Sequence, residues 1–162
     1  MTTILLFFSL FAFCRTIVVS AGQSITKVIE QAKNGDTIKV MPGVYREGSI
    51  TITKSITLIG INFPVIDGQS QFENLVISGT NTKVSGFILK DSRHSSSNDY
   101  SAINIIDATG IIIDNNKVIN AHSAFTSRIQ HTVPFGAMIS VGRPYLNKVP
   151  AMASISGNRV MY

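Results

Sequence analysis

Three histidines and five methionines are the side chains of this sequence that suit a soft transition metal. Copper(I) favours imidazole and thioether ligands, so copper is the metal that these side chains suit, although composition alone demonstrates no cofactor. The histidines, which we predict as the metal ligands, are His94, His122 and His131. His94 lies in a serine-rich stretch and the other two lie in an irregular segment, so all three are expected on loops. No His-x-His or Met-x-x-Met spacing accompanies them, and exposed loop histidines that bind nothing are the alternative.

Carboxylates could supply acid–base chemistry if two of them met on one face. Asp91, Asp107 and Asp114 lie near the ends of apolar stretches, and a glycoside-cleaving pair needs two such groups flanking one bond. Asp107 and Asp114 follow successive segments, which turns them in different directions. We therefore expect solvated acids here and predict no catalytic residue.

The positive charge of the chain is concentrated in its last third. Up to Asp114 the sequence carries nine basic and nine acidic residues, and after it only five basic ones, which make up the whole net charge of +5. A basic segment favours an acidic partner such as an acidic polysaccharide. These five cations form no cluster and have no interleaved aromatic residues, so nucleic acid is not expected as a partner.

The sequence begins with a candidate export signal. Residues 4–14 form an uncharged apolar run, "ILLFFSLFAFC", and the more polar stretch after it ends in "VVSA". Val19 and Ala21 are small residues at the positions that a signal peptidase reads, so we predict a signal peptide over residues 1–21, cleaved before Gly22. The mature protein is then expected to be periplasmic or secreted.

Two alternatives to a cleaved signal stay open. An uncleaved anchor is disfavoured because Arg15 leaves fewer than the roughly 20 apolar residues that cross a bilayer, and we expect no transmembrane segment after cleavage. A lipid anchor on Cys14 is disfavoured because the bulky Phe13 precedes it. Cys14 is the only cysteine, so the mature chain must be stable without disulfides.

The first element of the mature chain is predicted to be a short amphipathic helix. Within residues 24–35, apolar residues recur at helical spacing. They are Ile25, Val28, Ile29 and Ala32. Ser24 can cap the start of this helix, and the Asn34-Gly35 pair can end it. Farther along, "SITITKSITLIG" (49–60) alternates with a period of two, which is typical of strands.

The stretch "TGIIIDNNKVIN" (109–120) belongs to an internal repeat. Each copy begins with an apolar strand and a polar turn. An apolar residue, one residue of any type, and a Gly or Asn follow in that order, and a second apolar strand comes next. This frame superposes Ile77 on Ile106, Leu58 on Val84, Val84 on Ile113, Leu89 on Val118, and Ile113 on Ile155. The copies are 26, 29 and 42 residues apart, and polar insertions at 93–99 and 121–150 account for the longer spacings.

Repeats of about two dozen residues with only short strands predict a solenoid, in which like apolar side chains stack inward. We therefore predict an all-β fold, a right-handed parallel β-helix with a short N-terminal capping α-helix. Its rungs are expected over residues 22–120, followed by an irregular basic loop over 121–150 and by the start of a further, uncapped rung over 151–162. The asparagines predicted to bond neighbouring turns at the corners are Asn115, Asn116 and Asn158.

Four motifs near the start of the chain resemble a known family. They are Gly35-Asp36-Thr37-Ile38, Pro42-Gly43-Val44-Tyr45, the Ser55–Gly60 rung and Ile66-Asp67-Gly68. In this order they resemble the opening of the pectin-lyase-like right-handed β-helix proteins, and residues 24–120 are most similar to the NosD-type proteins of that superfamily. The resemblance implies a periplasmic accessory protein that assists maturation of the copper centres of nitrous oxide reductase. It also implies nitrous oxide reductase and components of an ABC transporter as partners.

Other hypotheses remain beside this resemblance. NosD-type chains are longer than this one, so the resemblance implies a truncated product. A secreted carbohydrate-active β-helix that binds or cleaves an acidic polysaccharide is one alternative, and a non-functional remnant is another. The Gly-His-Gly and Arg-x-Lys motifs of catalytic β-helices do not occur in the sequence, which disfavours cleavage.

Overall fold

The computed structural model describes residues 14–94, 100–121, 125–128 and 153–161. Most of these residues build three parallel sheets, here called A, B and C. Sheet A consists of β1 (Thr16–Val19), β2 (Thr37–Val40), β5 (Thr57–Gly60), β8 (Lys83–Ser85), β11 (Ile111–Asp114) and β14 (Ala153–Ser156). Sheet B consists of β3 (Val44–Tyr45), β6 (Val65–Asp67), β9 (Ile88–Lys90), β12 (Lys117–Ile119) and β15 (Arg159–Met161). Sheet C consists of β4 (Ile50–Ile52), β7 (Leu75–Ile77), β10 (Ile103–Ile106) and β13 (Phe125–Arg128).

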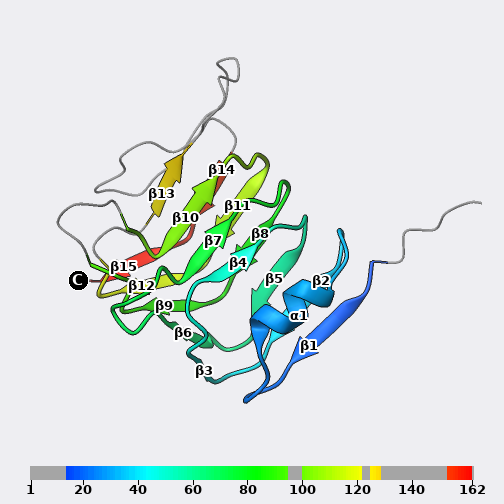
Figure 1. The fold of residues 1–162 in the computed structure, drawn as a ribbon, viewed down its shortest axis with the longest axis horizontal. Helices are drawn as coiled ribbons and strands as arrows, with labels where there is room; N and C mark the ends of the chain where they lie inside the picture. The colour runs from blue at the N-terminus through cyan, green and yellow to red at the C-terminus, as the bar shows by residue number, and fades with distance from the viewer. Residues whose placement is uncertain (1–13, 95–99, 122–124, 129–152, 162) are drawn as a thin grey trace, which may run out of the picture.

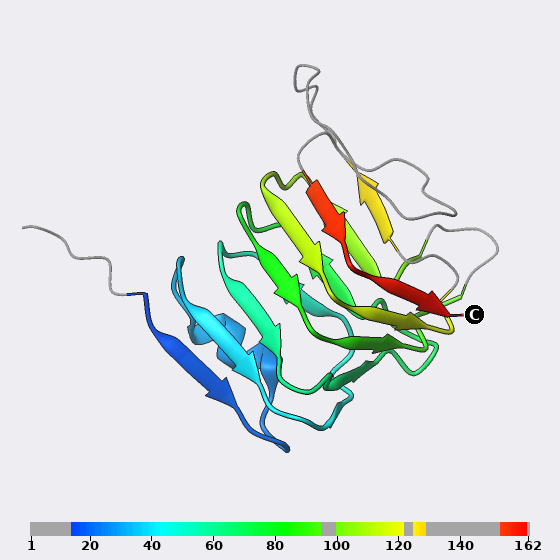
Figure 2. The same cartoon turned by 180° about the vertical axis from the view of Figure 1, so that it is seen from behind.

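The chain visits these sheets in a fixed order, which makes the fold a right-handed parallel β-helix, as the sequence predicts (Figure 1). Each turn runs from a strand of A to a strand of B and then of C, and each strand pairs in parallel with its equivalent one turn later. From β2 to β13 the described strands complete four such turns. Figure 2 shows the six strands of sheet A side by side, from β1 in blue to β14 in red.

The apolar residues of the repeat form the core. In sheet A, Leu58, Val84 and Ile113 stack on one another and have no exposed surface. In sheet B, Leu89 stacks on Val118 in the same way. These neighbours agree with the repeat found in the sequence. Since each side chain of this kind contributes roughly 1.5–3 kcal/mol when buried, stacking along the axis is the main source of stability.

One superposition predicted from the repeat is wrong by a single residue. Ile77 pairs with Ile105, whereas the gapless repeat superposes it on Ile106. The later turn has one more residue in the corner between sheets C and A, where Asp107 adopts a left-handed conformation with φ 47°. That corner absorbs the additional residue, so Ile105 is buried and Ile106 is only half-buried.

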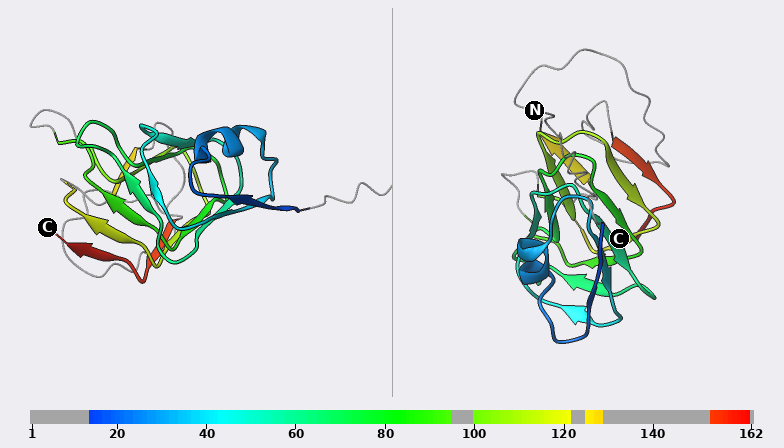
Figure 3. Two further views of the ribbon diagram at one scale, coloured as in Figure 1. Left: turned by 90° about the horizontal axis from the view of Figure 1, so that it is seen from below. Right: turned by 90° about the vertical axis from the view of Figure 1, so that its right-hand side faces the viewer.

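The predicted capping helix is present as α1 (Ile25–Gln31). Its cap is Ser24, whose side chain accepts a hydrogen bond from the backbone N–H of Lys27 at 3.1 Å. Ile25, Ile29 and the C-cap residue Ala32 are buried. The helix lies beside β4 at the N-terminal end of the stack, where it covers the edge of sheet C (Figure 3).

Two charged side chains that flank β4 bind the two ends of α1. Glu47 accepts hydrogen bonds from the backbone N–H groups of Ile25 and Thr26, at 2.8 and 3.0 Å. At the other end, the Nζ of Lys54 donates to the carbonyl oxygens of the last helical turn, at 2.6 to 3.1 Å. A carboxylate at the N-terminus and an ammonium at the C-terminus both match the helix dipole.

Two segments that the sequence analysis places outside the rungs contain strands. Residues 16–19, which the predicted signal peptide includes, form β1 at the edge of sheet A. Residues 125–128, which the predicted irregular loop over 121–150 includes, form β13 and pair with β10. This short strand lacks the Gly and Asn punctuation of the other copies, so the repeat pattern does not reveal it. No helix in the described part of the chain has the length and apolar character to cross a bilayer.

The predicted asparagine corner is present between sheets A and B. Asn115 adopts φ 51°, and the next residue, Asn116, is buried. The Oδ1 of Asn116 accepts the backbone N–H of Phe87 in the preceding turn at 3.0 Å, and the Oδ1 of Asn158 accepts the backbone N–H of Asn116 at 2.8 Å. Each side chain therefore bonds to the backbone of the turn before it.

Candidate binding surface on sheet B

Cationic side chains from three successive turns lie on the outward face of sheet B. In β12 and β15, Lys117 pairs with Arg159, and in β9 and β12, Ile88 pairs with Lys117. Because the neighbouring positions Leu89 and Val118 face the core, the side chains of this row face outward. Figure 1 shows β9, β12 and β15 as neighbours.

Lys90 lies two positions farther along β9 than Ile88, the register partner of Lys117, and so stands outside this row. Lys90, Lys117 and Arg159 are together called the cationic cluster. Adjacent strands lie about 4.8 Å apart, so Lys117 and Arg159 are one strand spacing apart, whereas Lys90 lies diagonally across from Lys117. Lys90 and Arg159 are exposed and Lys117 is half-buried. The solenoid thus brings together cations that are 27 and 42 positions apart in the sequence.

Apolar side chains adjoin the cluster. The ring of Phe63 lies under Lys117, with the Nζ 3.9 Å from the ring centroid. Toward the N-terminal end, the row continues with Ile88 and Val65, which are half-buried, and with Val44, which is 55% exposed. Such a face can bind a partner through both charge and apolar contact.

Acidic side chains neutralise part of this face. The Oδ2 of Asp67 accepts a hydrogen bond from the Nε of Arg46 at 3.0 Å. The Oδ2 of Asp91 forms an ion pair with the Nζ of Lys90 at 2.9 Å. The hydrogen bonds from Lys90 and from the amide of Asn120, 2.6 Å away, lower the pKa of Asp91.

Among the described residues, no acid pairs with Lys117 or Arg159. An ammonium and a guanidinium one strand apart can together bind carboxylates on a partner, and the guanidinium can do so in a bidentate manner. The positive half of the face is therefore the half nearer the C-terminal end of the stack.

The predicted metal ligands do not assemble a site within the described part of the chain. His94 is exposed and lies four residues after the last strand residue of β9. His122 and His131 lie outside the described residues. Where side chains are described, no three of the His, Cys, Asp and Glu residues lie close enough together to hold a metal ion.

The three acids considered for catalysis lie at three different corners of the solenoid. Asp91 follows β9 between sheets B and C, Asp107 follows β10 between C and A, and Asp114 ends β11 between A and B. No two of them share a face, so the structure forms no carboxylate pair from them.

Sequence reasoning missed the cationic cluster on sheet B. It treated the basic residues after Asp114 as scattered, because their separation along the chain hides their proximity. The repeat itself contained the signal, since it superposes "NKV" (116–118) on "NRV" (158–160) and so places Lys117 over Arg159.

No protein-family model matches this chain, and neither a curated protein nor a solved structure does.

Proposed function

We propose that this protein is an exported accessory protein of the NosD type, which binds a partner in the maturation of the copper centres of nitrous oxide reductase. It acts beside an ABC transporter and performs no catalysis of its own. The single observation that carries a binding role is the cationic cluster of sheet B, with its adjoining apolar row.

The resemblance to the pectin-lyase-like superfamily, on which the NosD proposal rests, is supported by where the four motifs of its opening lie in the fold. Gly35–Ile38 leads into β2, and Pro42–Tyr45 turns the chain into β3. Ser55–Gly60 leads into and forms β5, and Ile66–Gly68 ends β6 and begins the next corner. The motifs thus build the strands of sheets A and B in the first two turns, which is the role that the resemblance implies for them.

The cationic cluster favours an acidic surface on the partner. Lys117 and Arg159 present two positive charges without an acidic counterpart among the described residues. Opposite charges at an interface accelerate association and select the partner. The apolar row from Val44 to Ile88 supplies surface that a partner can cover.

Among the described residues, no three His, Cys, Asp or Glu side chains lie together, so the proposal assigns no copper ligand among them. Copper binding by the whole chain is therefore measured separately from partner binding. Titration of the exported protein with Cu(I), using a competing chelator, tests whether it carries copper itself.

Partner binding is tested with purified nitrous oxide reductase and the transporter components. We expect the exported protein to bind one of them, and the double substitution Lys117→Glu and Arg159→Glu to weaken binding about tenfold or more. Lys39→Glu is the matched control, because Lys39 is an exposed lysine on sheet A. Absence of binding, or equal weakening by the control, contradicts the proposal.

An acidic polysaccharide is the second candidate partner, and the contact between Lys117 and Phe63 favours it. A cation over an aromatic ring offers both a charge for a carboxylate and an apolar surface for a sugar ring. Retention on immobilised polygalacturonate that falls with salt and with the double substitution supports this candidate. Cleavage of the polymer contradicts the accessory role.

A further inference from the structure

The first strand of the solenoid lies within the predicted signal peptide. Residues 16–19 form β1 and pair with β2 in full register, Ile17 with Ile38 and Val19 with Val40. Val19 has no exposed surface, and Ile17 packs against the core. Cleavage before Gly22 would therefore remove a strand of sheet A and one buried side chain.

Residues 15–19 also bond the backbone of β2 and of the residue that follows it. The backbone N–H of Thr37 donates to the carbonyl of Arg15, and that of Met41 donates to the carbonyl of Val19, both at 2.9 Å. Without β1, the backbone groups of β2 that face it would lose their partners, which is costly wherever water does not replace them.

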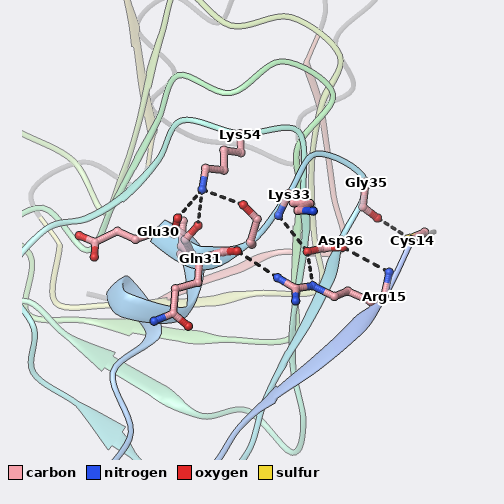
Figure 4. Close-up of polar contacts among 10 residues, drawn as sticks. Cys14, Arg15, Glu30, Gln31, Lys33, Gly35, Asp36 and Lys54 are labelled. Carbon is pink, nitrogen blue, oxygen red and sulfur yellow. Dashed lines mark hydrogen bonds and ion pairs between the residues drawn. The ribbon is translucent and has the colours of Figure 1, made fainter. Parts of the chain in front are cut away.

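Arg15 joins β1 to both α1 and β2 (Figure 4). Its Nε donates to the Oδ2 of Asp36 at 2.8 Å, and its Nη2 donates to the carbonyl of Gln31 at 3.0 Å, in the last turn of α1. The side chain of Asp36 is only 1% exposed. Removal of Arg15 would leave this carboxylate with the backbone N–H of Lys33 as its remaining donor, and a buried charge without its counterion is strongly unfavourable.

A second pair of small residues in the sequence marks a cleavage site that keeps β1. The apolar run ends at Cys14, and Ala12 and Cys14 occupy the two positions before Arg15 that a signal peptidase reads. Cys14 is exposed, and its thiol contacts the carbonyl of Gly35. Loss of Cys14 would remove that contact and none of those that hold β1.

We propose that signal peptidase cleaves between Cys14 and Arg15, so that the mature protein begins at Arg15. Hydrolysis of this peptide bond consumes one water; Cys14 leaves with the new carboxylate, and the nitrogen of Arg15 becomes an amine that takes up a proton. That nitrogen already lies 3.2 Å from the Oδ1 of Asp36. The new ammonium group therefore forms an ion pair with Asp36 in the place where the amide N–H stood.

The position is tested on the full chain with a C-terminal tag, expressed in a Gram-negative host and recovered from the periplasm. Intact mass and N-terminal sequencing of the product identify its first residue. We expect Arg15. A product that begins at Gly22, or at any residue after Arg15, overturns the proposal.

Two substitutions separate the candidate sites. Ala12→Tyr places a bulky side chain three positions before Arg15 and is expected to abolish the Arg15 product. Ala21→Tyr blocks cleavage before Gly22 and is expected to leave the Arg15 product unchanged. This inference rests on the export included in the proposed function. An uncut chain retained in the cytoplasm contradicts both, whereas a periplasmic product beginning at Gly22 contradicts the position alone.

Discussion

At the scale of single residues, Asn116 completes the backbone of the turn before it. Its Oδ1 accepts the N–H of Phe87, and its Nδ2 donates to the carbonyl of Val84. We predict that Asn116→Ala lowers the free energy of unfolding by about 2–3 kcal/mol, since it leaves buried backbone groups without partners. Urea denaturation measures this loss. Asn115→Gly is the control, and it should change stability by less than about 0.5 kcal/mol because glycine adopts the same left-handed conformation freely.

Asp36 makes part of the stability depend on pH. The backbone N–H of Lys33 and the guanidinium of Arg15 lower the pKa of Asp36 from 3.8 to about 2. A depressed pKa in the folded state means that the carboxylate stabilises the fold above pH 3.8, and that this contribution is lost as the pH falls through about 2.

Asp36→Asn should therefore be destabilised relative to the natural chain at pH 6, and the difference should shrink between pH 4 and pH 2. The measurement is the urea midpoint of both proteins across this range. A difference that stays constant with pH would show that Asp36 acts through its shape rather than its charge.

At the scale of elements, α1 depends on side chains that belong to the first full turn. The Nζ of Lys54 donates to three carbonyl oxygens near the C-terminus of the helix. At the other end, burial of Glu47 raises its pKa. The hydrogen bonds that its carboxylate accepts from Ser24, Ile25 and Thr26 outweigh this effect, so the pKa of Glu47 is lowered. A helix of seven residues is too short to be stable by itself.

We predict that Lys54→Met lowers the free energy of unfolding, because it removes the charged hydrogen bonds to the end of the helix. The expected loss is about 1–2 kcal/mol, since Lys54 is partly exposed and water weakens these bonds. Thermal unfolding followed by circular dichroism provides the measurement. Lys39→Met makes the same change on an exposed strand position and should have little effect. Equal losses in the two variants would contradict a capping role for Lys54.

The elements that the sequence predicts well are those whose pattern is local. Helix α1 follows from its apolar spacing and its Ser24 cap, and most rungs follow from the stacked pairs of the repeat. Strand β1 is hidden because "TIVV" (16–19) directly follows an apolar leader and shares its character. The cationic cluster of the site is hidden for another reason: it exists only once the turns are stacked, and no local window contains Lys90, Lys117 and Arg159 together.

At the scale of the whole molecule, the stability of a solenoid is the sum of its turns and of the contacts between neighbouring turns. Gly60 and Gly86 lie at the same corner of successive turns, where the backbones approach closely. A Cβ on Gly60 would lie 2.4 Å from the carbonyl oxygen of Gly86 and 2.8 Å from the Cδ of Pro64. Because the first of these atoms belongs to the backbone, the corner can relieve the clash only by separating the two turns.

Gly60→Ala is therefore expected to cost about 2 kcal/mol or more and to act locally along the axis. Amide hydrogen exchange should accelerate most in β5 and β8, the strands on either side of the clash, and least in β12, which is farther along the stack. Gly43→Ala is the control, because a Cβ there would meet the ring of Tyr45 at an ordinary 3.4 Å. Uniform acceleration in all strands would instead show that the described turns unfold as one cooperative unit, so that a defect at one corner weakens every turn alike.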